Sequence, residues 1–435
     1  MAVSDGEHIM VVKDMGLVAQ VFDEPSLNSL HGHIAVGHCR YSTTGASTWN
    51  NAQPTFRAIA DGHAMALAHN GNLTNTGELE KWLSSEDNGH DVPSKNRMDS
   101  TSDTALVSAL LAVYSSEGLR KAAQRVLPEL RGAFCLVFCT ETTLYAARDP
   151  QGIHPLVLGR LERGWVVASE TAALDIVGAT FIREVEPGEL IVIDQAGLRS
   201  HRFADADPKG CLFEYVYLAR PDTRICGQRI QRVRMEIGKT LALESQVDAD
   251  LVIPTPESGT PAAIGYARAS GIPYGQGLVK NAYVGRTFIQ PSQTIRQLGI
   301  RLKLNPIRDV IEGQRLVVVD DSIVRGNTQR ALVSMLRQAG AAEVHVRIAS
   351  PRVEWPCFYG IDFATRAELI APGLTDEEIC RSIGADSLAY VSLEGLIACT
   401  GVPKRTLCRA CFDGDYPVEV PPGRLAEMGL EETHV

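Results

Sequence analysis

The sequence predicts two domains of different fold class, an α+β domain of layered strands and helices and then an α/β domain with a parallel sheet. The first observation is a run of short strand candidates, interrupted by two helical segments, that extends to about residue 200. The second is a change to alternating strand and helix further along the chain, which is typical of a parallel sheet. The third is length, because 435 residues favour two domains, each large enough for its own core.

In the first domain, placed at residues 1–207, the strand candidates are short apolar runs bounded by Gly, Asp or Pro. They cover residues 8–12, 34–39, 64–68, 134–138, 143–146, 165–168 and 190–193. Apolar residues recur at helical spacing within 103–114 and 118–127, so we expect two helices there. Pro208, Lys209 and Gly210 then mark the domain junction.

The second domain is predicted at residues 208–400, followed by a C-terminal segment at 401–435. Its alternation begins with a helix at 229–243, a strand at 251–253 and a helix at 261–269. The next strand, at 316–319, is apolar without polar alternation. We therefore expect it to be covered on both faces in a parallel sheet.

Two carboxylates end this strand. Asp320 and Asp321 come where open parallel sheets bind ligands, beyond the carboxyl ends of the strands. A turn with Gly326 then leads into a helix that we expect Thr328 to cap, and its N-terminus offers backbone N–H groups to a phosphate. The two acids can bind vicinal hydroxyls or a hydrated Mg²⁺, so the segment fits a phosphorylated ribose. The alternative is an acidic turn after a buried strand. A Walker A loop is excluded, because its Gly-Lys-Ser/Thr ending is absent.

Composition narrows the class of protein. The net charge is −10 with both signs interspersed, which argues against a nucleic-acid or anionic-membrane surface. No apolar stretch approaches the roughly 18 residues of a membrane span, and the N-terminus shows no signal-peptide pattern. We therefore expect a cytoplasmic enzyme, in which the ten cysteines are reduced thiols or metal ligands.

The segment 315–328, Arg-Leu-Val-Val-Val-Asp-Asp-Ser-Ile-Val-Arg-Gly-Asn-Thr, resembles the phosphoribosyl diphosphate (PRPP) signature of type I phosphoribosyltransferases. In that family the two acids contact the ribose hydroxyls and the loop after them holds the 5′-phosphate. The resemblance therefore assigns PRPP binding to Asp320, Asp321, Ser322, Arg325, Gly326, Asn327 and Thr328. Asn327 is the one departure, since relatives usually carry Thr there, and a contact made by the backbone would survive it.

Two further stretches of the second domain resemble the same kind of enzyme. The turn 254–261 resembles the diphosphate loop, in which Ser258 would be a hydroxyl near Mg²⁺; alternatively, Ser258 only caps the next helix. The span 280–303 resembles the mobile loop of glutamine-dependent PRPP transferases, which closes over the substrate. Lys280 and Arg286 would there offset the charge of the diphosphate, while closure excludes water. By composition alone this span is an ordinary exposed loop.

Polar loops at 37–44, 50–54 and 69–75, together with Asp103, resemble the glutamine-binding half of an N-terminal-nucleophile (Ntn) amidotransferase. Singly, each could be an Asx turn or a helix cap. In that family an Arg binds the substrate carboxylate, an Asp its ammonium, and an Asn with the next Gly N–H forms the oxyanion hole. The resemblance places these roles on Arg40, Asp103, Asn70 and Gly71, with Thr43 as a further substrate contact.

The chain departs from the Ntn pattern at its start. Glutaminase chemistry in that family belongs to a cysteine at the first position, whose own α-amine is the general base. This chain begins Met1-Ala2-Val3, and Cys39 lies mid-chain without a free α-amine. We therefore expect the Ntn-type domain to be truncated at its N-terminus and unable to hydrolyse glutamine, unless the start was placed wrongly.

Four cysteines raise the question of a metal centre. Cys408 and Cys411 form a C-x-x-C unit, and Cys211 and Cys357 share apolar, aromatic surroundings. Four thiolates would fit Zn²⁺ or an iron–sulfur cluster, and spacing does not choose between them; separate structural cysteines are the third alternative. A subgroup of glutamine PRPP amidotransferases carries a [4Fe–4S] cluster at matching positions, and on that resemblance we expect one here.

Together, the motifs between residues 2 and 417 are similar to those of the amidophosphoribosyltransferase family. The resemblance implies conversion of PRPP, glutamine and water to 5-phosphoribosylamine, glutamate and diphosphate, the first step of de novo purine biosynthesis. It also implies a homo-oligomer inhibited by purine nucleotides. Without the nucleophile, we expect this chain to use free ammonia. The alternative is a PRPP-binding regulatory protein without transferase activity, although Lys280 and Arg286 favour catalysis.

Overall fold

The computed structural model describes residues 1–40, 48–86, 102–281, 303–361, 365–427 and 429–430. The chain forms two compact units. Unit 1 comprises Met1–Gly210, Cys357–Asp362 and Tyr416–Leu425; unit 2 comprises Cys211–Pro356, Phe363–Asp415 and Ala426–Val435. Two late pieces of the chain thus belong to the first unit. The domain limits 207/208 and 400/401 stay predictions.

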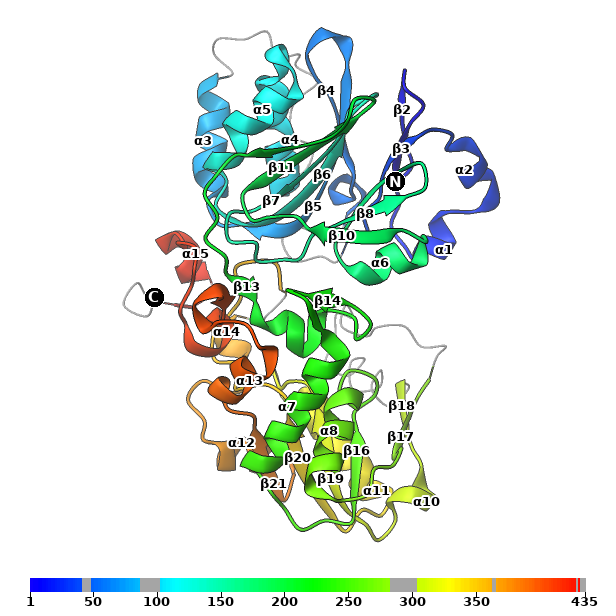
Figure 1. Ribbon diagram of the computed structural model, residues 1–435. Coiled ribbons are helices and arrows are strands. Elements are labelled where there is room, and N and C mark those ends of the chain that lie inside the picture. Colours follow the sequence, from blue (N-terminus) through cyan, green and yellow to red (C-terminus); the bar gives the residue numbers. More distant parts are fainter. Residues whose placement is uncertain (41–47, 87–101, 282–302, 362–364, 428, 431–435) are drawn as a thin grey trace. The chain divides into compact units, whose positions relative to one another are not determined.

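Unit 1 is organised around a six-stranded antiparallel sheet in the order β12-β11-β7-β6-β5-β4 (Figure 1). The strands are β4 (Thr55–Ala58), β5 (Ala64–Leu73), β6 (Gly132–Cys139), β7 (Leu144–Arg148), β11 (Glu189–Asp194) and β12 (Gly197–Arg202). Strand β5 is longer than the expected 64–68, because residues 69–73 continue to pair with β6. The polar stretch after residue 68 is therefore first a strand and only then a loop.

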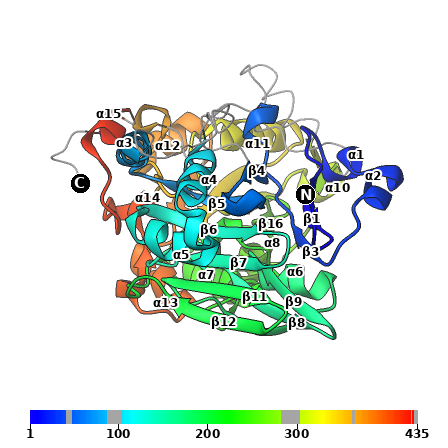
Figure 2. The same ribbon diagram turned by 90° about the horizontal axis from the view of Figure 1, so that it is seen from above.

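Helices α3 (Thr76–Glu86), α4 (Asp103–Val113) and α5 (Leu119–Val126) lie against one face of this sheet (Figures 1 and 2). The core between the two layers includes Leu106 and Leu110 of α4 and Phe134 and Phe138 of β6, all fully buried. The cap of α4 is Ser102, whose hydroxyl accepts the Ala105 N–H. This cap sets Asp103 in the first turn of the helix.

The opposite face of the large sheet carries two small antiparallel sheets, ordered β2-β1-β3 and β10-β8-β9. Ala66 and Ala68 of β5 pack against Ala2 and Val36 on that side. The elements are β1 (Ala2–Ser4), β2 (Ile9–Val11), α1 (Val18–Val21), α2 (Glu24–Ser29), β3 (Ile34–Val36), β8 (Val157–Leu161), β9 (Gly164–Ala168), α6 (Thr171–Ile176) and β10 (Thr180–Glu184). Unit 1 is thus the layered α+β fold that the sequence predicts.

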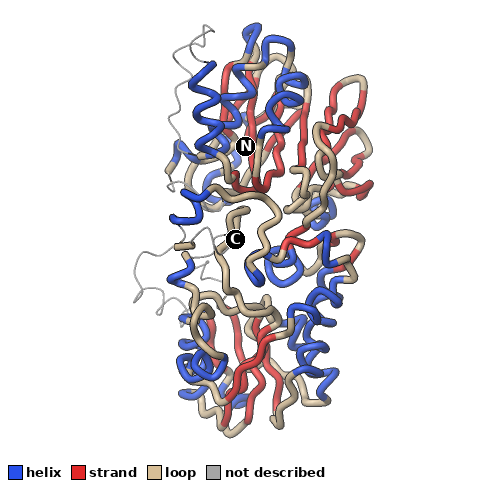
Figure 3. Tube along the Cα trace, turned by 90° about the vertical axis from the view of Figure 1, so that its left-hand side faces the viewer, coloured by secondary structure: helices blue, strands red, loops and turns tan. Residues whose placement is uncertain are grey.

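Unit 2 contains a four-stranded parallel sheet in the order β16-β19-β20-β21. The strands are β16 (Leu251–Pro254), β19 (Arg315–Asp320), β20 (Glu343–Ile348) and β21 (Ser387–Tyr390). Residues 316–319 have no exposed surface, which confirms that β19 is covered on both faces. Figure 3 shows these strands between helices on two sides.

On one face of the parallel sheet, α11 (Asn327–Gln338) and α12 (Asp376–Ile383) pack into the core. On the other, α8 (Thr260–Ser270) contacts β16 and β19 and is itself packed on α7 (Ile230–Glu244). The two helices meet at glycines: a Cβ on Gly238 or on Gly265 would lie 1.9 Å from a carbonyl oxygen of the facing helix. Only glycine permits this approach.

The remaining α-helices and strands of the described ranges are short. They are β13 (Gly210–Cys211), β14 (Arg224–Ile225), β15 (Gln228–Arg229), β17 (Leu278–Lys280), β18 (Leu304–Pro306), α10 (Arg308–Ile311), α13 (Leu393–Thr400), β22 (Leu407–Cys408), α14 (Ala410–Asp413) and α15 (Pro422–Glu427). None of the helices in the described ranges is long and apolar enough to cross a membrane.

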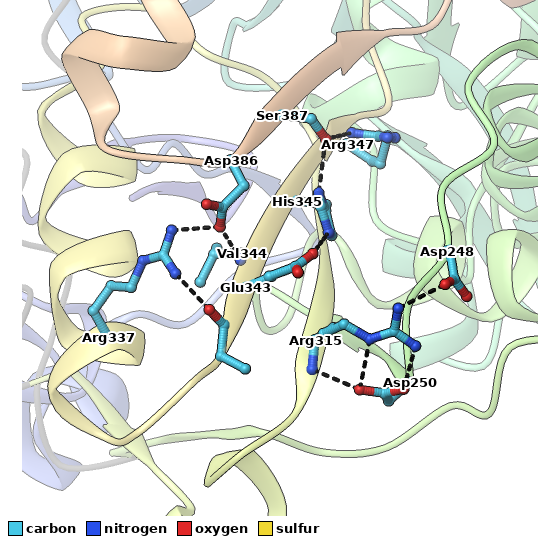
Figure 4. A network of polar contacts seen from close by, with 11 residues as sticks. Asp248, Asp250, Arg315, Arg337, Glu343, Val344, His345, Arg347, Asp386 and Ser387 are labelled. Carbon is cyan, nitrogen blue, oxygen red and sulfur yellow. Dashed lines mark hydrogen bonds and ion pairs between the residues drawn. The ribbon is translucent and has the colours of Figure 1, made fainter.

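The amino ends of the parallel strands are tied together by charged side chains (Figure 4). Arg315 donates to both oxygens of Asp250, at 3.2 and 2.7 Å, and its guanidinium holds the pKa of that carboxyl at about 2. Asp386 accepts from Arg337 and from the Val344 N–H. The sheet is thus fastened at the end opposite to Asp320, which leaves its carboxyl end for a ligand.

Candidate functional site

The acid pair lies at the carboxyl end of β19, as the sequence predicts. Pro254 of β16 is in register with Val319, and the Thr255 N–H donates to the Val319 oxygen at 2.8 Å. The loops that leave the two strands therefore start side by side. Asp320 and Asp321 are 5% and 8% exposed.

Burial makes ionisation of these carboxyls costly. It raises the pKa of Asp320 well above the usual value, and the adjacent Asp321 charge raises it further. Burial also raises the pKa of Asp321, although hydrogen bonds from Ser258 and Ser322 oppose that shift. The pair is thus short of positive charge and hydrogen-bond donors, which a cation or vicinal hydroxyls would supply.

The loop after β16 approaches the acids through a glycine. A Cβ on Gly259 would lie 2.4 Å from the Val319 oxygen and 3.2 Å from the Asp320 Cα. This contact brings Ser258 to Asp321, to which its hydroxyl donates. Helix α8 has Gly259 as its N-cap, so the alternative that Ser258 only caps the helix is wrong.

The turn after the acids leads directly into α11. The Ser322 hydroxyl donates to Asp321 Oδ1 at 2.5 Å. Gly326 is the N-cap with φ of +73°, a conformation that favours glycine, and the helix begins at Asn327. The expectation that Thr328 caps the helix is therefore wrong, and Thr328 is an exposed residue of the first turn.

Two other turn residues have protein partners. Arg325 donates to Glu368 Oε2 at 2.9 and 3.0 Å, and the Asn327 side-chain oxygen accepts from Arg330 at 3.1 Å. Asn327 and Gly326 nevertheless keep their place at the helix N-terminus, where backbone N–H groups favour an anion.

Sequence reasoning missed three residues near the acids. Gln329 donates from Nε2 to Asp320 Oδ2. The buried Arg234 of α7 binds backbone carbonyl oxygens at residues 215 and 219, and its charge acts on Asp321. Thr255 is 6% exposed, and in the described part of the chain its hydroxyl finds no hydrogen-bond partner. The only local signal was the position of Gln329 one residue after the motif.

Lys280 ends β17 and faces the loop after β16. Its Nζ lies 3.0 Å from Glu257 Oε2, and both side chains are largely exposed. An exposed ion pair of this kind contributes about 0–1 kcal/mol, so a bound anion could replace Glu257 readily. Arg286, assigned to the same loop, lies outside the described residues.

In unit 1, the structure gathers most residues of the predicted glutamine pocket at the ends of β5 and α4. Asp103 Oδ2 lies 3.5 Å from His69 Nδ1 and accepts the Leu73 N–H at 3.1 Å. Burial acts to raise the pKa of Asp103, but His69 and the backbone N–H donors outweigh it, so the pKa is lowered. The Asp103 charge also acts on Arg40. Thr43 lies outside the described residues.

Asn70 and Gly71 sit on β5 next to this acid. The Asn70 side chain is exposed, whereas His69 before it is buried. Gly71 has φ of +144°, and an added Cβ would lie 2.1 Å from the Ala133 oxygen. From the late segment of unit 1, Gly360 backs onto Gly71, since its Cβ would lie 3.1 Å from the Gly71 carbonyl carbon. Sequence reasoning did not identify this support.

The four cysteines assigned to a cluster are divided between the units. Cys357 belongs to unit 1, whereas Cys211, Cys408 and Cys411 belong to unit 2. Over the described ranges, no group of three or more His, Cys, Asp or Glu side chains is placed to hold a metal ion. The structure does not support the expected [4Fe–4S] cluster.

The donors at the acid pair do fit Mg²⁺. They are hard oxygen ligands, and Mg²⁺ is commonly held by one or two carboxylates together with waters and substrate phosphates. Asp320 and Asp321 supply the carboxylates, and Ser258 a hydroxyl beside them.

Comparison with known proteins shows that the chain is similar to amidophosphoribosyltransferases. A glutamine amidotransferase domain model matches residues 38–175. The amidophosphoribosyltransferase of Mycobacterium leprae is 62% identical over 426 residues, which is 97% of this chain and 76% of that protein. Those of Synechococcus elongatus and Bacillus subtilis are 48% and 45% identical over 97% and 96% of the chain, and the matches cover 85% and 87% of the relatives.

Two solved structures share the fold. The glutamine PRPP amidotransferase of B. subtilis, complexed with ADP and GMP, matches with a TM-score of 0.88 at 45% identity, covering 97% of this chain and 91% of that one. A structure described as the allosteric regulatory enzyme of purine biosynthesis matches with a TM-score of 0.89 at 45% identity, over 97% and 90% of the two chains.

Proposed function

Because this chain belongs to the amidophosphoribosyltransferase family, whose members are glycosyltransferases of purine biosynthesis, we propose that its acid-pair site binds PRPP and transfers the phosphoribosyl group to ammonia. The observation that carries the proposal is the buried pair Asp320 and Asp321 at the carboxyl end of β19, with Ser258 beside it. Two acids this buried are costly to the fold, and a ribose with a metal ion accounts for them.

Each part of the site has a task in this reaction. Asp320 and Asp321 accept hydrogen bonds from the ribose hydroxyls, and the N–H groups from Ser322 to Thr328 hold the 5′-phosphate. Mg²⁺, held at the acids and Ser258, would neutralise the leaving diphosphate. Lys280 exchanges Glu257 for a diphosphate oxygen, which its weak exposed ion pair permits.

The first unit is proposed to bind glutamine. Arg40 binds the α-carboxylate, Asp103 the ammonium, and Asn70 with the Gly71 N–H stabilises an oxyanion. Cys39, next to Arg40 in the sequence, lies mid-chain and has no α-amine of its own to act as base. We propose ammonia as the nitrogen donor at the acid-pair site.

Diphosphate release from PRPP and Mg²⁺ tests the proposal, measured first with an ammonium salt and then with glutamine. We expect turnover with ammonium and none with glutamine. Equal rates with both donors would contradict the ammonia proposal. PRPP binding without product at any ammonium concentration would instead favour a PRPP-binding regulatory protein.

Two further properties are proposed on family grounds. Purine nucleotides are proposed to bind and inhibit, since the B. subtilis structure holds ADP and GMP, and the chain is proposed to form a homo-oligomer. The cluster on Cys211, Cys357, Cys408 and Cys411 stays a prediction, which iron and acid-labile sulfide analysis of the anaerobically purified protein would decide.

A further inference from the structure

Gln329 lies in the first turn of α11, but its side chain does not serve the helix. A Gln at the third helical position often reaches back to the N-cap N–H. In α11 no such cap bond forms at Gly326. The Gln329 amide, which is 2% exposed, donates instead from Nε2 to Asp320 Oδ2. The side chain is therefore directed to the acid.

This contact completes the support of Asp320. Its Oδ1 accepts the Asp321 N–H at 2.9 Å, and its Oδ2 accepts from Gln329. Each carboxylate oxygen can accept a second hydrogen bond, so both remain available to a ligand hydroxyl. These two hydrogen bonds thus restrain rotation of the Asp320 carboxylate and leave acceptor positions on both of its oxygens.

A packing role does not explain the residue. A buried amide is costly unless both of its ends are paired, and an apolar side chain of the same size would fill the space without that cost. Within the described ranges, no donor reaches Gln329 Oε1. The Gln329 amide thus stays at this position although its oxygen is unpaired. Its retention is explained if the hydrogen bond from Nε2 to Asp320 is needed for function.

We propose that Gln329 is a positioning residue that fixes the Asp320 carboxylate for binding of the ribose hydroxyls of PRPP. The inference rests on the proposed function of the acid pair and extends it to Gln329, which contacts Asp320. Asp321 has separate anchors in Ser258 and Ser322. Asp320 also has a side-chain hydrogen bond with Asp321. Losing Gln329 therefore loosens Asp320 more than Asp321, and ordering that carboxylate again on binding lowers the affinity for PRPP.

The substitution Gln329→Met tests this, because it keeps the length of the side chain and removes the amide. Calorimetric titration with PRPP and Mg²⁺ is expected to show binding about tenfold weaker than in the parent, or about 1.4 kcal/mol. In the ammonia-dependent reaction the KM for PRPP rises, whereas the KM for ammonia is unchanged. Gln338→Met is the matched control at the exposed end of the same helix, where Gln338 donates to Ser334, and it binds PRPP like the parent.

Parent-like PRPP affinity in Gln329→Met overturns the inference. So does a lowered unfolding midpoint with both KM values raised alike, since that indicates general damage. If Gln329→Met does not fold, Gln329→Glu replaces it, because it keeps the size and sets a third carboxyl against Asp320; parent-like binding there overturns the inference too. A parent chain that fails to bind PRPP would instead refute the proposed function.

Discussion

At the scale of single residues, the acid pair that we propose for ligand binding destabilises the ligand-free fold. Burial and the neighbouring Asp321 charge raise the pKa of Asp320, so keeping both carboxyls ionised is costly to the fold. The ligand-free protein therefore carries an unfavourable group that the proposed ribose and cation would relieve. Gln329, Ser258 and Ser322 supply donors that lower this cost without removing it.

A second residue-scale consequence concerns pH. His38 Nε2 donates to the His69 carbonyl oxygen at 3.0 Å, and burial lowers the pKa of His38 from 6.5 to about 4. Between these values the unfolded chain binds the proton and the folded chain does not, so stability is full above pH 6.5 and falls as pH drops toward 4. Each pKa unit corresponds to about 1.4 kcal/mol.

We predict that His38→Gln, which stays neutral, loses less unfolding free energy than the parent between pH 6.5 and 4, by at most about 3 kcal/mol. Urea unfolding at several pH values measures this. The exposed His33→Gln serves as control and follows the parent. Coincident pH profiles for His38→Gln and the parent would refute the assignment.

At the scale of elements, the loop after β16 depends on one glycine. A Cβ on Gly259 would meet the backbone oxygens of Val319 and Thr255 at 2.4 and 3.0 Å, and backbone cannot move aside as a side-chain end can. The loop and Ser258 with it would have to shift away from the acids.

We predict that Gly259→Ala lowers the unfolding free energy by about 1–3 kcal/mol and weakens PRPP binding as well. Gly77→Ala is the control, because Gly77 is an exposed residue of α3 with open space around its Cβ position. That change is expected to stabilise by about 0.5–1 kcal/mol. Chemical denaturation and calorimetry measure both, and full PRPP affinity in Gly259→Ala would show that the close approach is not needed.

The sequence predicted an element correctly where its own residues determine the structure, and failed where contacts with other parts of the fold determine it. The apolar run 316–319 identifies β19 by itself, since a strand covered on both faces needs no polar side. The expected cap at Thr328 was wrong, and the alternative cap at Ser258 does not form. Both are good cap residues by type, but Gly326 and Gly259 are the N-caps. The types of the neighbouring residues do not show that a glycine, and not the adjacent Thr or Ser, is the N-cap.

At the scale of the whole molecule, the chain returns to its first unit late. Residues 357–362 and 416–425 join unit 1, where Phe358 and Tyr359 offer carbonyl oxygens to Asn72 and His154 at 2.8 and 2.7 Å. No local pattern predicts contacts between residues so far apart in sequence. For the same reason Arg234 and Gly360 were missed, while the acid motif, being contiguous, was found.

The central claim is that Asp320 and Asp321 bind an activated ribose phosphate at a cost to the ligand-free fold. Calorimetric titration of PRPP with Mg²⁺ into the variant Asp320→Asn/Asp321→Asn tests it most directly, with the thermal unfolding midpoint as proof of folding. We predict that binding is lost while the ligand-free midpoint is equal or higher, because the buried repulsion is gone. A folded double variant that titrates like the parent would contradict the account.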